Sequence, residues 1–306
     1  MQFSSRALCL ASFFMVVTAA PSLTLSSPEP NYWFSFGDSY TATGFLSSGP
    51  LPSPGDPLGN PPYPGLTVTG GPYWIDYLTT TYNQSLTLTY NFAVAGATIN
   101  ASLVQPVLGV TFEDEVLTYL HKFSDKPPFT AWKSSNTLFS IWIGINDIGR
   151  SYFNPGDRDA FSDLLLDSYF KLVEQLYAYR ECHVQTGARF FLFINVPPVN
   201  RSPLVRARGV ESQDTEKAVI QGYNDKLLTR ISNFGQNHPD VRTWFWDSHA
   251  AFTAILDDPA PYGFQDVTSW NPVDPTYFWG NDYHPGSTAH KIFAQEMRSS
   301  LEDFPW

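Results

Sequence analysis

The amino-acid sequence predicts an α/β fold in which a parallel sheet of five strands is covered by helices on both faces. Three observations predict it: five short apolar runs, amphipathic stretches between them, and regular alternation of the two along the chain. Strands that are apolar on both faces are typical of a sheet buried between helix layers. Strand–helix alternation implies crossover connections and therefore parallel strands.

The expected elements follow one another from residue 33 to residue 301. We expect strands over residues 33–36, 86–90, 138–143, 190–194 and 241–246. Helices are expected near residues 72–81, 111–123, 159–186, 212–235 and 287–301. The third helix has apolar residues at helical spacing: Phe161, Leu165, Tyr169, Leu172, Val173 and Leu176. Residues 49–71 are rich in proline and glycine, which predicts a rigid loop over the domain rather than a helix or a central strand.

Composition and charge limit the partners. Hydrophobic residues make up 43% of the 306 residues and charged residues 15%, which is typical of a chain that buries a large core. The 18 basic residues are outnumbered by 29 acidic ones, and no basic cluster could neutralise phosphates or an anionic membrane surface. We therefore expect no nucleic-acid partner and no membrane anchor. We also expect a monomer that acts on neutral small molecules or oligosaccharides.

The N-terminus is predicted to be a secretion signal. Arg6 precedes an apolar run over residues 7–17, and small residues near Ala20 offer a cleavage site. The run is short for a transmembrane helix, although an N-terminal anchor or a buried helix is the alternative. We expect residues 1–20 to be the signal peptide and residues 21–306 a single domain. N-x-Ser sequons support a secreted, extracellular glycoprotein, and they begin at Asn83, Asn100 and Asn200.

A Gly-Asp-Ser turn follows the first strand. Ligands of open parallel sheets bind beyond the carboxyl ends of the strands, so Ser39 stands at the edge where a nucleophile is expected. Gly37 before it allows a sharp turn and a close approach of a substrate. Taken alone, the same residues also fit a helix cap.

Two further turns carry candidate hydrogen-bond donors. Gly96, after the second strand, offers a bare backbone N–H, and Asn146, after the third, offers an amide N–H. Both could stabilise a developing oxyanion. We expect Asp147 to act as a helix cap.

His284 lies in a constrained Asp-Tyr-His-Pro-Gly loop just before the last helix. A neutral imidazole there could take the proton of Ser39. We expect the other histidines to be structural or exposed, with His249 as a distant second choice. No H-E-x-x-H motif and no closely spaced pair of cysteines is present, so we expect neither a cofactor nor a metal.

The four motifs in this order resemble those of the SGNH (GDSL) hydrolase family, from about residue 32 to the last helix. Residues 54–65 look most like the fungal acetylesterases of carbohydrate esterase family 16. The resemblance implies a flavodoxin-like three-layer α/β/α fold with strand order 2-1-3-4-5, and a metal-independent carboxylic ester hydrolase. It implies Ser39 as nucleophile and as an oxyanion donor together with Gly96 and Asn146, and His284 as the base.

One departure from the family pattern concerns the group that orients His284. The acidic member of the triad normally lies three residues before the histidine, and here that position is Asn281. We assign the role to Asp282, two residues before His284. The alternatives are Asn281 itself or a backbone carbonyl in a Ser–His dyad.

The function expected from the resemblance is hydrolysis of short acyl esters, above all acetyl groups on hemicellulose-derived oligosaccharides. The alternative is a GDSL lipase or phospholipase that acts on longer acyl chains, and a binding module without activity is a third hypothesis. Four aromatic residues could form a sugar-stacking cleft or could instead fill the core: Tyr63, Tyr73, Trp74 and Trp279.

Overall fold

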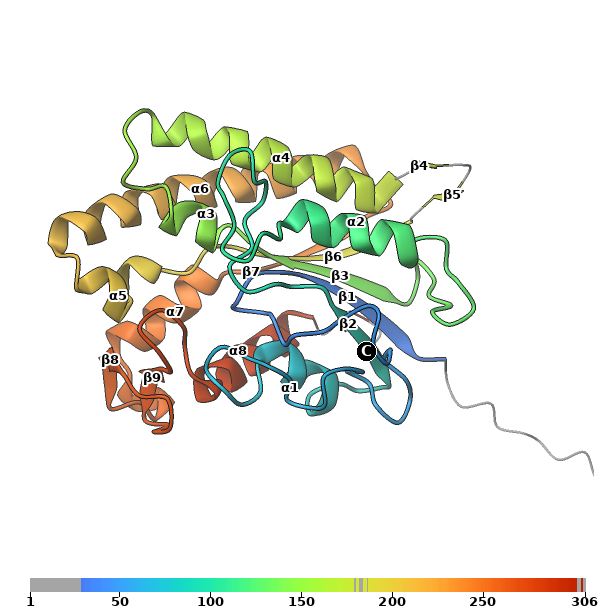
Figure 1. The fold of residues 1–306 in the computed structure, drawn as a ribbon, viewed down its shortest axis with the longest axis horizontal. Coiled ribbons are helices and arrows are strands. Elements are labelled where there is room, and N and C mark those ends of the chain that lie inside the picture. The colour runs from blue at the N-terminus through green and yellow to red at the C-terminus, as the bar shows by residue number, and fades with distance from the viewer. Residues whose placement is uncertain (1–28, 179, 182–183, 186, 302–303, 305–306) are drawn as a thin grey trace, which may run out of the picture.

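A parallel sheet of five strands forms the centre of the computed structural model (Figure 1), which describes residues 29–178, 180–181, 184–185, 187–301 and 304. Its order is β2-β1-β3-β6-β7, and every neighbouring pair is parallel. The strands are β1 (Asn31–Gly37), β2 (Thr87–Asn91), β3 (Thr137–Trp142), β6 (Phe190–Ile194) and β7 (Arg242–Trp246). Counted along the chain, this order is 2-1-3-4-5, so the predicted fold class is confirmed.

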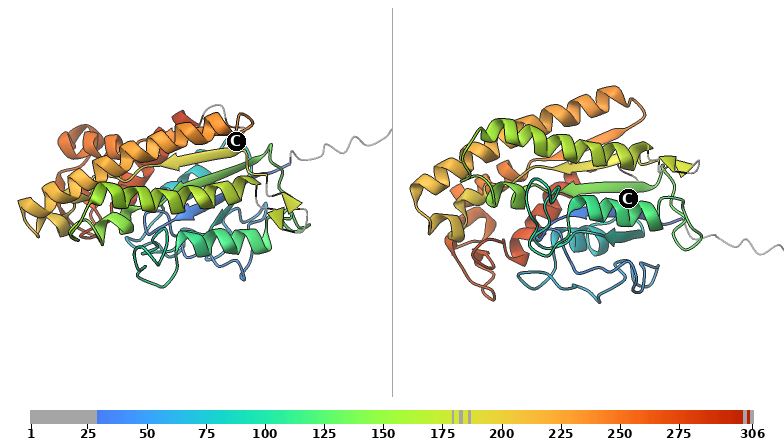
Figure 2. Two further views of the ribbon diagram at one scale, coloured as in Figure 1. Left: turned by 90° about the horizontal axis from the view of Figure 1, so that it is seen from above. Right: turned by 45° about the horizontal axis from the view of Figure 1, so that its top comes forward.

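Helices cover both faces of the sheet (Figure 2). One face carries α2 (Phe112–Lys122), α4 (Arg158–Ala178) and α6 (Val210–Asn237). The other carries α1 (Trp74–Thr80) and α8 (Ser287–Ser300). Every residue of the first three strands is buried, as expected of a sheet that packs against helices on both sides.

The predicted helix over residues 159–186 is the element whose bounds differ most from the structure. Five of the six apolar residues at helical spacing are buried and Phe161 is half-buried, but α4 ends at Ala178. The last fully buried apolar residue of the helix is Leu176, two residues before its end. A two-residue antiparallel pair, β4 (Arg180–Glu181) and β5 (Val184–Gln185), follows instead.

Short elements that the sequence did not predict gather where the central strands end, at the left of Figure 1. They are α3 (Ile145–Gly149), η1 (Val199–Arg201), α5 (Pro203–Arg206), α7 (Ser248–Asp257), η2 (Ala260–Tyr262), β8 (Asp266–Trp270) and β9 (Tyr277–Trp279). All but α7 span five residues or fewer, which is too short for a clear hydrophobic periodicity. Together they build the walls of the carboxyl edge of the sheet.

The proline- and glycine-rich segment, residues 49–71, contains turns and bends but no helix, as predicted. Its end is attached to the loop that carries His284, because the Thr69 hydroxyl donates to the Pro285 carbonyl at 3.2 Å. The predicted signal peptide, residues 1–20, lies outside the described residues. That segment and the domain boundary at residue 21 stay predictions.

Candidate active site

Ser39 lies in the turn that follows β1, at the carboxyl edge of the sheet. Gly37 ends the strand with a φ of +156°, and a Cβ there would lie 2.4 Å from the Trp142 carbonyl oxygen, so only glycine fits. Asp38 closes the turn, because its carboxyl accepts the Tyr40 N–H at 3.0 Å. The capping role considered for this motif therefore belongs to Asp38, which leaves the Ser39 hydroxyl available.

His284 lies in the loop between β9 and α8, and the structure brings it to Ser39 as predicted. Its Nε2 is 2.7 Å from the Ser39 Oγ. The loop is closed by the Gly280 N–H, which donates to the His284 carbonyl at 2.9 Å. The hydroxyl of Tyr40 donates to the carbonyl of Tyr283. The residue after the candidate nucleophile thus holds the loop of the candidate base.

The side chain of Asn281 orients the imidazole ring. Its Oδ1 accepts the backbone N–H groups of Tyr283 at 2.9 Å and His284 at 2.8 Å, and it lies 2.9 Å from the His284 Nδ1. A backbone N–H can only donate, so the atom that meets both must be the amide oxygen. The Nδ1 facing that oxygen must then carry the ring proton. The unprotonated Nε2 is consequently the atom that faces Ser39.

Asp282 does not occupy the orienting position that we assigned to it. Its side chain is exposed and makes no hydrogen bond or ion pair with any residue that the structure describes. Its carbonyl accepts the Leu204 N–H at 2.8 Å, which attaches α5 to this loop. The reason is the local conformation. The Asn281 side chain accepts the backbone N–H groups of Tyr283 and His284. This turns the loop so that the Asp282 side chain faces outward.

Burial lowers the pKa of His284 to about 4, and it is the only cause of the shift. The amide that faces Nδ1 is neutral, so it supplies no charge to stabilise an imidazolium. The imidazole is therefore neutral, and able to accept a proton, over the whole range above about pH 5.

The backbone N–H groups of Ser39 and Gly96 have no acceptor among the described residues. Gly96 is held at a φ of +78°, and a Cβ there would lie 2.4 Å from the Val107 Cβ. Asn146 donates one amide N–H to the Ala97 carbonyl at 3.0 Å, which holds its side chain beside the same loop. The structure thus gathers the three predicted oxyanion donors on neighbouring loops.

Asp147 ties two of these loops together instead of capping a helix. The N-cap of α3 is Gly144, and Asp147 lies inside the helix, fully buried. Its carboxyl oxygens accept the Ile99 N–H at 3.0 and 3.2 Å. The predicted capping role of Asp147 is therefore wrong, because the left-handed conformation of Gly144 begins the helix.

Glu115 is a residue of the site that the sequence analysis missed. It comes from α2, is 2% exposed, and accepts the N–H of Gly37 at 2.9 Å and that of Val94 at 3.1 Å. These residues precede Ser39 and Gly96 by two positions each. Burial raises the pKa of Glu115 well above its usual value. One signal was available: an acidic residue inside the apolar stripe of a helix.

The predicted aromatic cleft is mostly core. Tyr73, Trp74 and Trp279 belong to the hydrophobic core, where each ring packs against another buried ring. Trp74 lies edge-on to the ring of Trp142, with centroids 5.9 Å apart. Of the four rings only Tyr63, at 50% exposed, remains available.

The arrangement has the parts that acyl transfer needs: a hydroxyl, a neutral base that faces it, an acceptor that orients the base, and free N–H donors nearby. Among the described residues, no group of three or more His, Cys, Asp or Glu side chains is placed to hold a metal ion. In the same part of the chain, no helix combines the length and apolarity needed to cross a membrane.

Comparisons with known proteins agree with this geometry. Residues 34–297 match the model of the GDSL-like lipase/acylhydrolase family. The chain is 35% identical over 297 residues to an acetylesterase of Thermothelomyces thermophilus, with 96% of this chain and 95% of that protein covered. It is 26% identical over 341 residues to an acetylesterase of Hypocrea jecorina, covering 95% and 94%.

A solved structure of an acetylxylan esterase from Geobacillus stearothermophilus is 16% identical, with a TM-score of 0.47 and coverage of 90% and 94%. The family match spans nearly all of the described chain and includes every motif discussed above. The chain therefore belongs to the GDSL-like lipase/acylhydrolase family, and it is a carboxylic ester hydrolase.

Proposed function

We propose that this protein is a secreted acetylesterase that removes acetyl groups from hemicellulose-derived oligosaccharides, with Ser39 as the nucleophile. The observation that carries the proposal is the contact of 2.7 Å between the Ser39 Oγ and the unprotonated Nε2 of His284. The two fungal relatives that match over nearly their whole length are both acetylesterases, which supports acetyl as the acyl group.

In the first half-reaction, Ser39 Oγ attacks the ester carbonyl carbon and its proton passes to His284 Nε2. The charge that develops on the carbonyl oxygen is stabilised by the N–H groups of Ser39 and Gly96 and by the Asn146 amide. Collapse of the tetrahedral intermediate breaks the bond to the alcohol, which leaves with the proton from Nε2.

In the second half-reaction, water attacks the acetyl-serine and gives one proton to His284 Nε2. Collapse releases acetic acid and returns the proton to Ser39 Oγ. The Asn281 oxygen accepts the Nδ1–H throughout, so the ring does not rotate between the two steps.

The decisive experiment compares hydrolysis of an aryl acetate and an aryl octanoate by the purified protein. We expect a strong preference for acetate and a loss of at least about 10³-fold in Ser39→Ala. Ser232→Ala, an exposed serine of α6, is the matched control and should retain full activity. Faster octanoate turnover would favour the lipase or phospholipase alternative, and full activity in Ser39→Ala would overturn the nucleophile assignment.

Secretion and the oligosaccharide substrate have tests of their own. The mature N-terminus should lie near residue 21, measured by terminal sequencing of protein from culture medium. Asn200 is 6% exposed, so we propose only Asn83 and Asn100 as glycosylated, which a mass shift on deglycosylation would measure. Release of acetate from acetylated xylo-oligosaccharides tests the substrate class, and light scattering tests the proposed monomer.

A further inference from the structure

A pocket of about 210 Å³ lies beside the candidate oxyanion donor Asn146. It is lined by residues of α3, α5, α6 and the loops next to them: Asn146, Gly149, Arg150, Leu204, Arg208, Glu216 and Tyr283. Tyr283 directly precedes His284, so the pocket borders both the candidate donor Asn146 and the loop of the base. The pocket therefore lies next to two of the loops that carry candidate catalytic residues.

The pocket contains a buried carboxyl group with unused hydrogen-bonding capacity. Glu216 is 0% exposed, and neither of its carboxyl oxygens has a hydrogen-bond partner among the described residues. A buried polar group without a partner destabilises a fold, and such groups are rare unless they have a functional role. Burial raises the pKa of Glu216 to about 7, while the charge of Arg208 acts in the opposite direction.

The absence of a side chain at Gly149 leaves room in the pocket beside the Tyr283 hydroxyl and the Glu216 carboxyl. A Cβ at Gly149 would lie 2.6 Å from the hydroxyl oxygen of Tyr283 and 3.6 Å from Oε1 of Glu216. Leu204, which also lines the pocket, is attached to the His284 loop because its N–H donates to the Asp282 carbonyl at 2.8 Å. The pocket is thus continuous with the loop that positions His284.

We propose that this pocket binds the hydroxyl groups of the alcohol part of the ester, the sugar unit that bears the acetyl group, and that Glu216 recognises them. A carboxyl group can accept hydrogen bonds from two neighbouring hydroxyls, and the exposed Arg150 and Arg208 can donate to further oxygens. An acyl chain has no donor to offer the Glu216 carboxyl, and placing it here would remove water from two guanidinium groups. The inference rests on the proposed function, because the hydroxyls belong to the substrate proposed there.

The test compares two substrates in the full-length protein: a monoacetylated xyloside, which carries free hydroxyls, and an aryl acetate, which carries none. In Glu216→Leu we expect kcat/KM to fall about 10- to 100-fold more on the xyloside than on the aryl acetate, mainly through KM. Arg208→Gln, whose side chain is exposed, should show the same selectivity with a smaller loss. Glu211→Gln, an exposed acid of the same helix, is the matched control and should change neither rate.

A second measurement separates failure of the inference from failure of the proposed function. Methyl xyloside should inhibit hydrolysis of the aryl acetate competitively, and Glu216→Leu should weaken that inhibition about tenfold or more. If the wild type does not hydrolyse the acetylated xyloside, but methyl xyloside competitively inhibits its hydrolysis of the aryl acetate, the proposed substrate is wrong and the pocket assignment holds. Equal losses on both substrates, or inhibition that Glu216→Leu does not alter, would overturn the assignment.

Discussion

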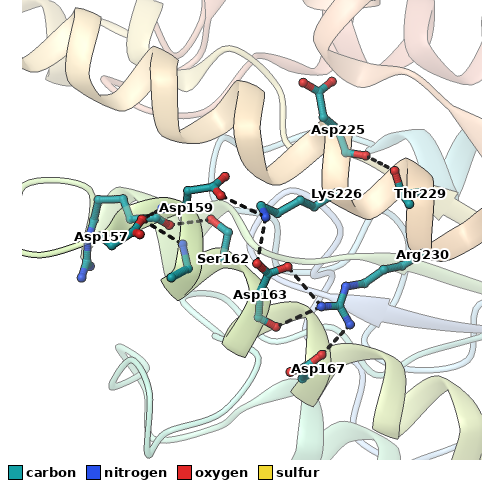
Figure 3. Close-up of polar contacts among 11 residues, drawn as sticks. Asp157, Asp159, Ser162, Asp163, Asp167, Asp225, Lys226, Thr229 and Arg230 are labelled. Carbon is teal, nitrogen blue, oxygen red and sulfur yellow. Dashed lines mark hydrogen bonds and ion pairs between the residues drawn. The ribbon is translucent and has the colours of Figure 1, made fainter.

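The carboxyl groups at the catalytic edge of the sheet differ in kind from those on the outer face of α4 and α6. At the edge, Glu115 and Asp147 are buried, accept backbone N–H groups, and have their pKa values raised by burial. On the outer face, Asp163 pairs with Lys226 at 2.8 Å and with Arg230 at 3.2 Å (Figure 3). There the hydrogen bond from Lys226 is the first cause of a lowered pKa of Asp163.

This difference in burial and partners predicts which acidic residues affect the rate of the reaction. A buried carboxyl that accepts two backbone N–H groups fixes the spacing of two chain segments, because the lost hydrogen bonds cannot be replaced by water. An exposed ion pair is hydrated in both states and is screened by salt, so breaking it changes little. Acids at the edge should therefore affect rate, and those on the outer face should affect neither rate nor fold appreciably.

The largest effect expected at the edge after loss of the nucleophile comes from the side chain that orients the base. Asn281→Ala removes the acceptor of the Nδ1–H and of two backbone N–H groups, so kcat should fall about 10²- to 10³-fold. Asp282→Ala, which removes an exposed carboxyl one residue away, should keep kcat within about threefold of the wild type. A greater loss in Asp282→Ala than in Asn281→Ala would reverse the assignment made from the structure.

A smaller loss is expected when the bridge between the two oxyanion loops is altered. Glu115→Gln replaces one acceptor oxygen by an NH₂ group that faces a backbone N–H, so one of the two hydrogen bonds is lost. We expect kcat to fall about 10- to 100-fold with little change in KM, because the oxyanion donors act on the transition state.

Glu113→Gln on the same helix is the control for that variant, since its amide can still accept the hydrogen bond of Asn100. A transition-state analogue such as a boronic acid should bind Glu115→Gln less tightly in the same proportion as kcat falls. Unchanged affinity for the analogue would show that Glu115 serves the fold alone.

The candidate site residues could be predicted from the sequence because each stands in a motif at the end of a strand or the start of a helix, and the motifs follow a stated order. Ser39, Gly96 and Asn146 follow predicted strands, and His284 precedes the last predicted helix. The choice between Asn281 and Asp282 could not be made in this way. It depends on a turn in which one amide oxygen accepts three hydrogen bonds, and residue type alone favours the carboxylate.

The helix residues of the site are a different case, because their position depends on how a helix sits on the sheet. Glu115 reaches the loops after β1 and β2 only because α2 packs beside them, and Glu216 reaches its pocket from the buried face of α6. Each interrupts an apolar stripe with a charge, which is a visible signal of a buried acid. The partner of that acid is set by tertiary packing, which the sequence pattern does not contain.

The pH dependence of kcat/KM tests a further difference between the two regions. The candidate base His284 faces the neutral amide of Asn281, whereas the groups on the outer face of α4 and α6 form ion pairs. The active form is the neutral imidazole, and burial lowers the pKa of His284 to about 4, so the acid limb of kcat/KM should lie near pH 4. A histidine of ordinary pKa near 6.5 would be about 97% protonated at pH 5. Asn281→Asp places a carboxylate against the Nδ1–H, which favours the imidazolium and should move the limb to higher pH by about one unit or more.

Profiles of kcat/KM between pH 3.5 and pH 8 measure the acid limb of the wild type and that of Asn281→Asp. Circular dichroism at each pH shows whether the protein stays folded. A wild-type limb near pH 6.5 would contradict the burial of the ring as its controlling influence. An unshifted limb in Asn281→Asp would show that residue 281 does not face the imidazole in solution.

The smallest effect is expected on the outer face of α4 and α6. Lys226→Met breaks the ion pairs with Asp159 at 3.1 Å and Asp163 at 2.8 Å, yet these side chains are solvated and have alternative partners in water. The melting temperature should fall by no more than about 3 °C, the difference should vanish in 0.5 M salt, and kcat/KM should not change. Thermal unfolding at low and high salt, with the rate on an aryl acetate, tests this. A tenfold loss of activity in Lys226→Met would break the distinction between the two regions, because it would connect an exposed ion pair to the spacing of the catalytic loops.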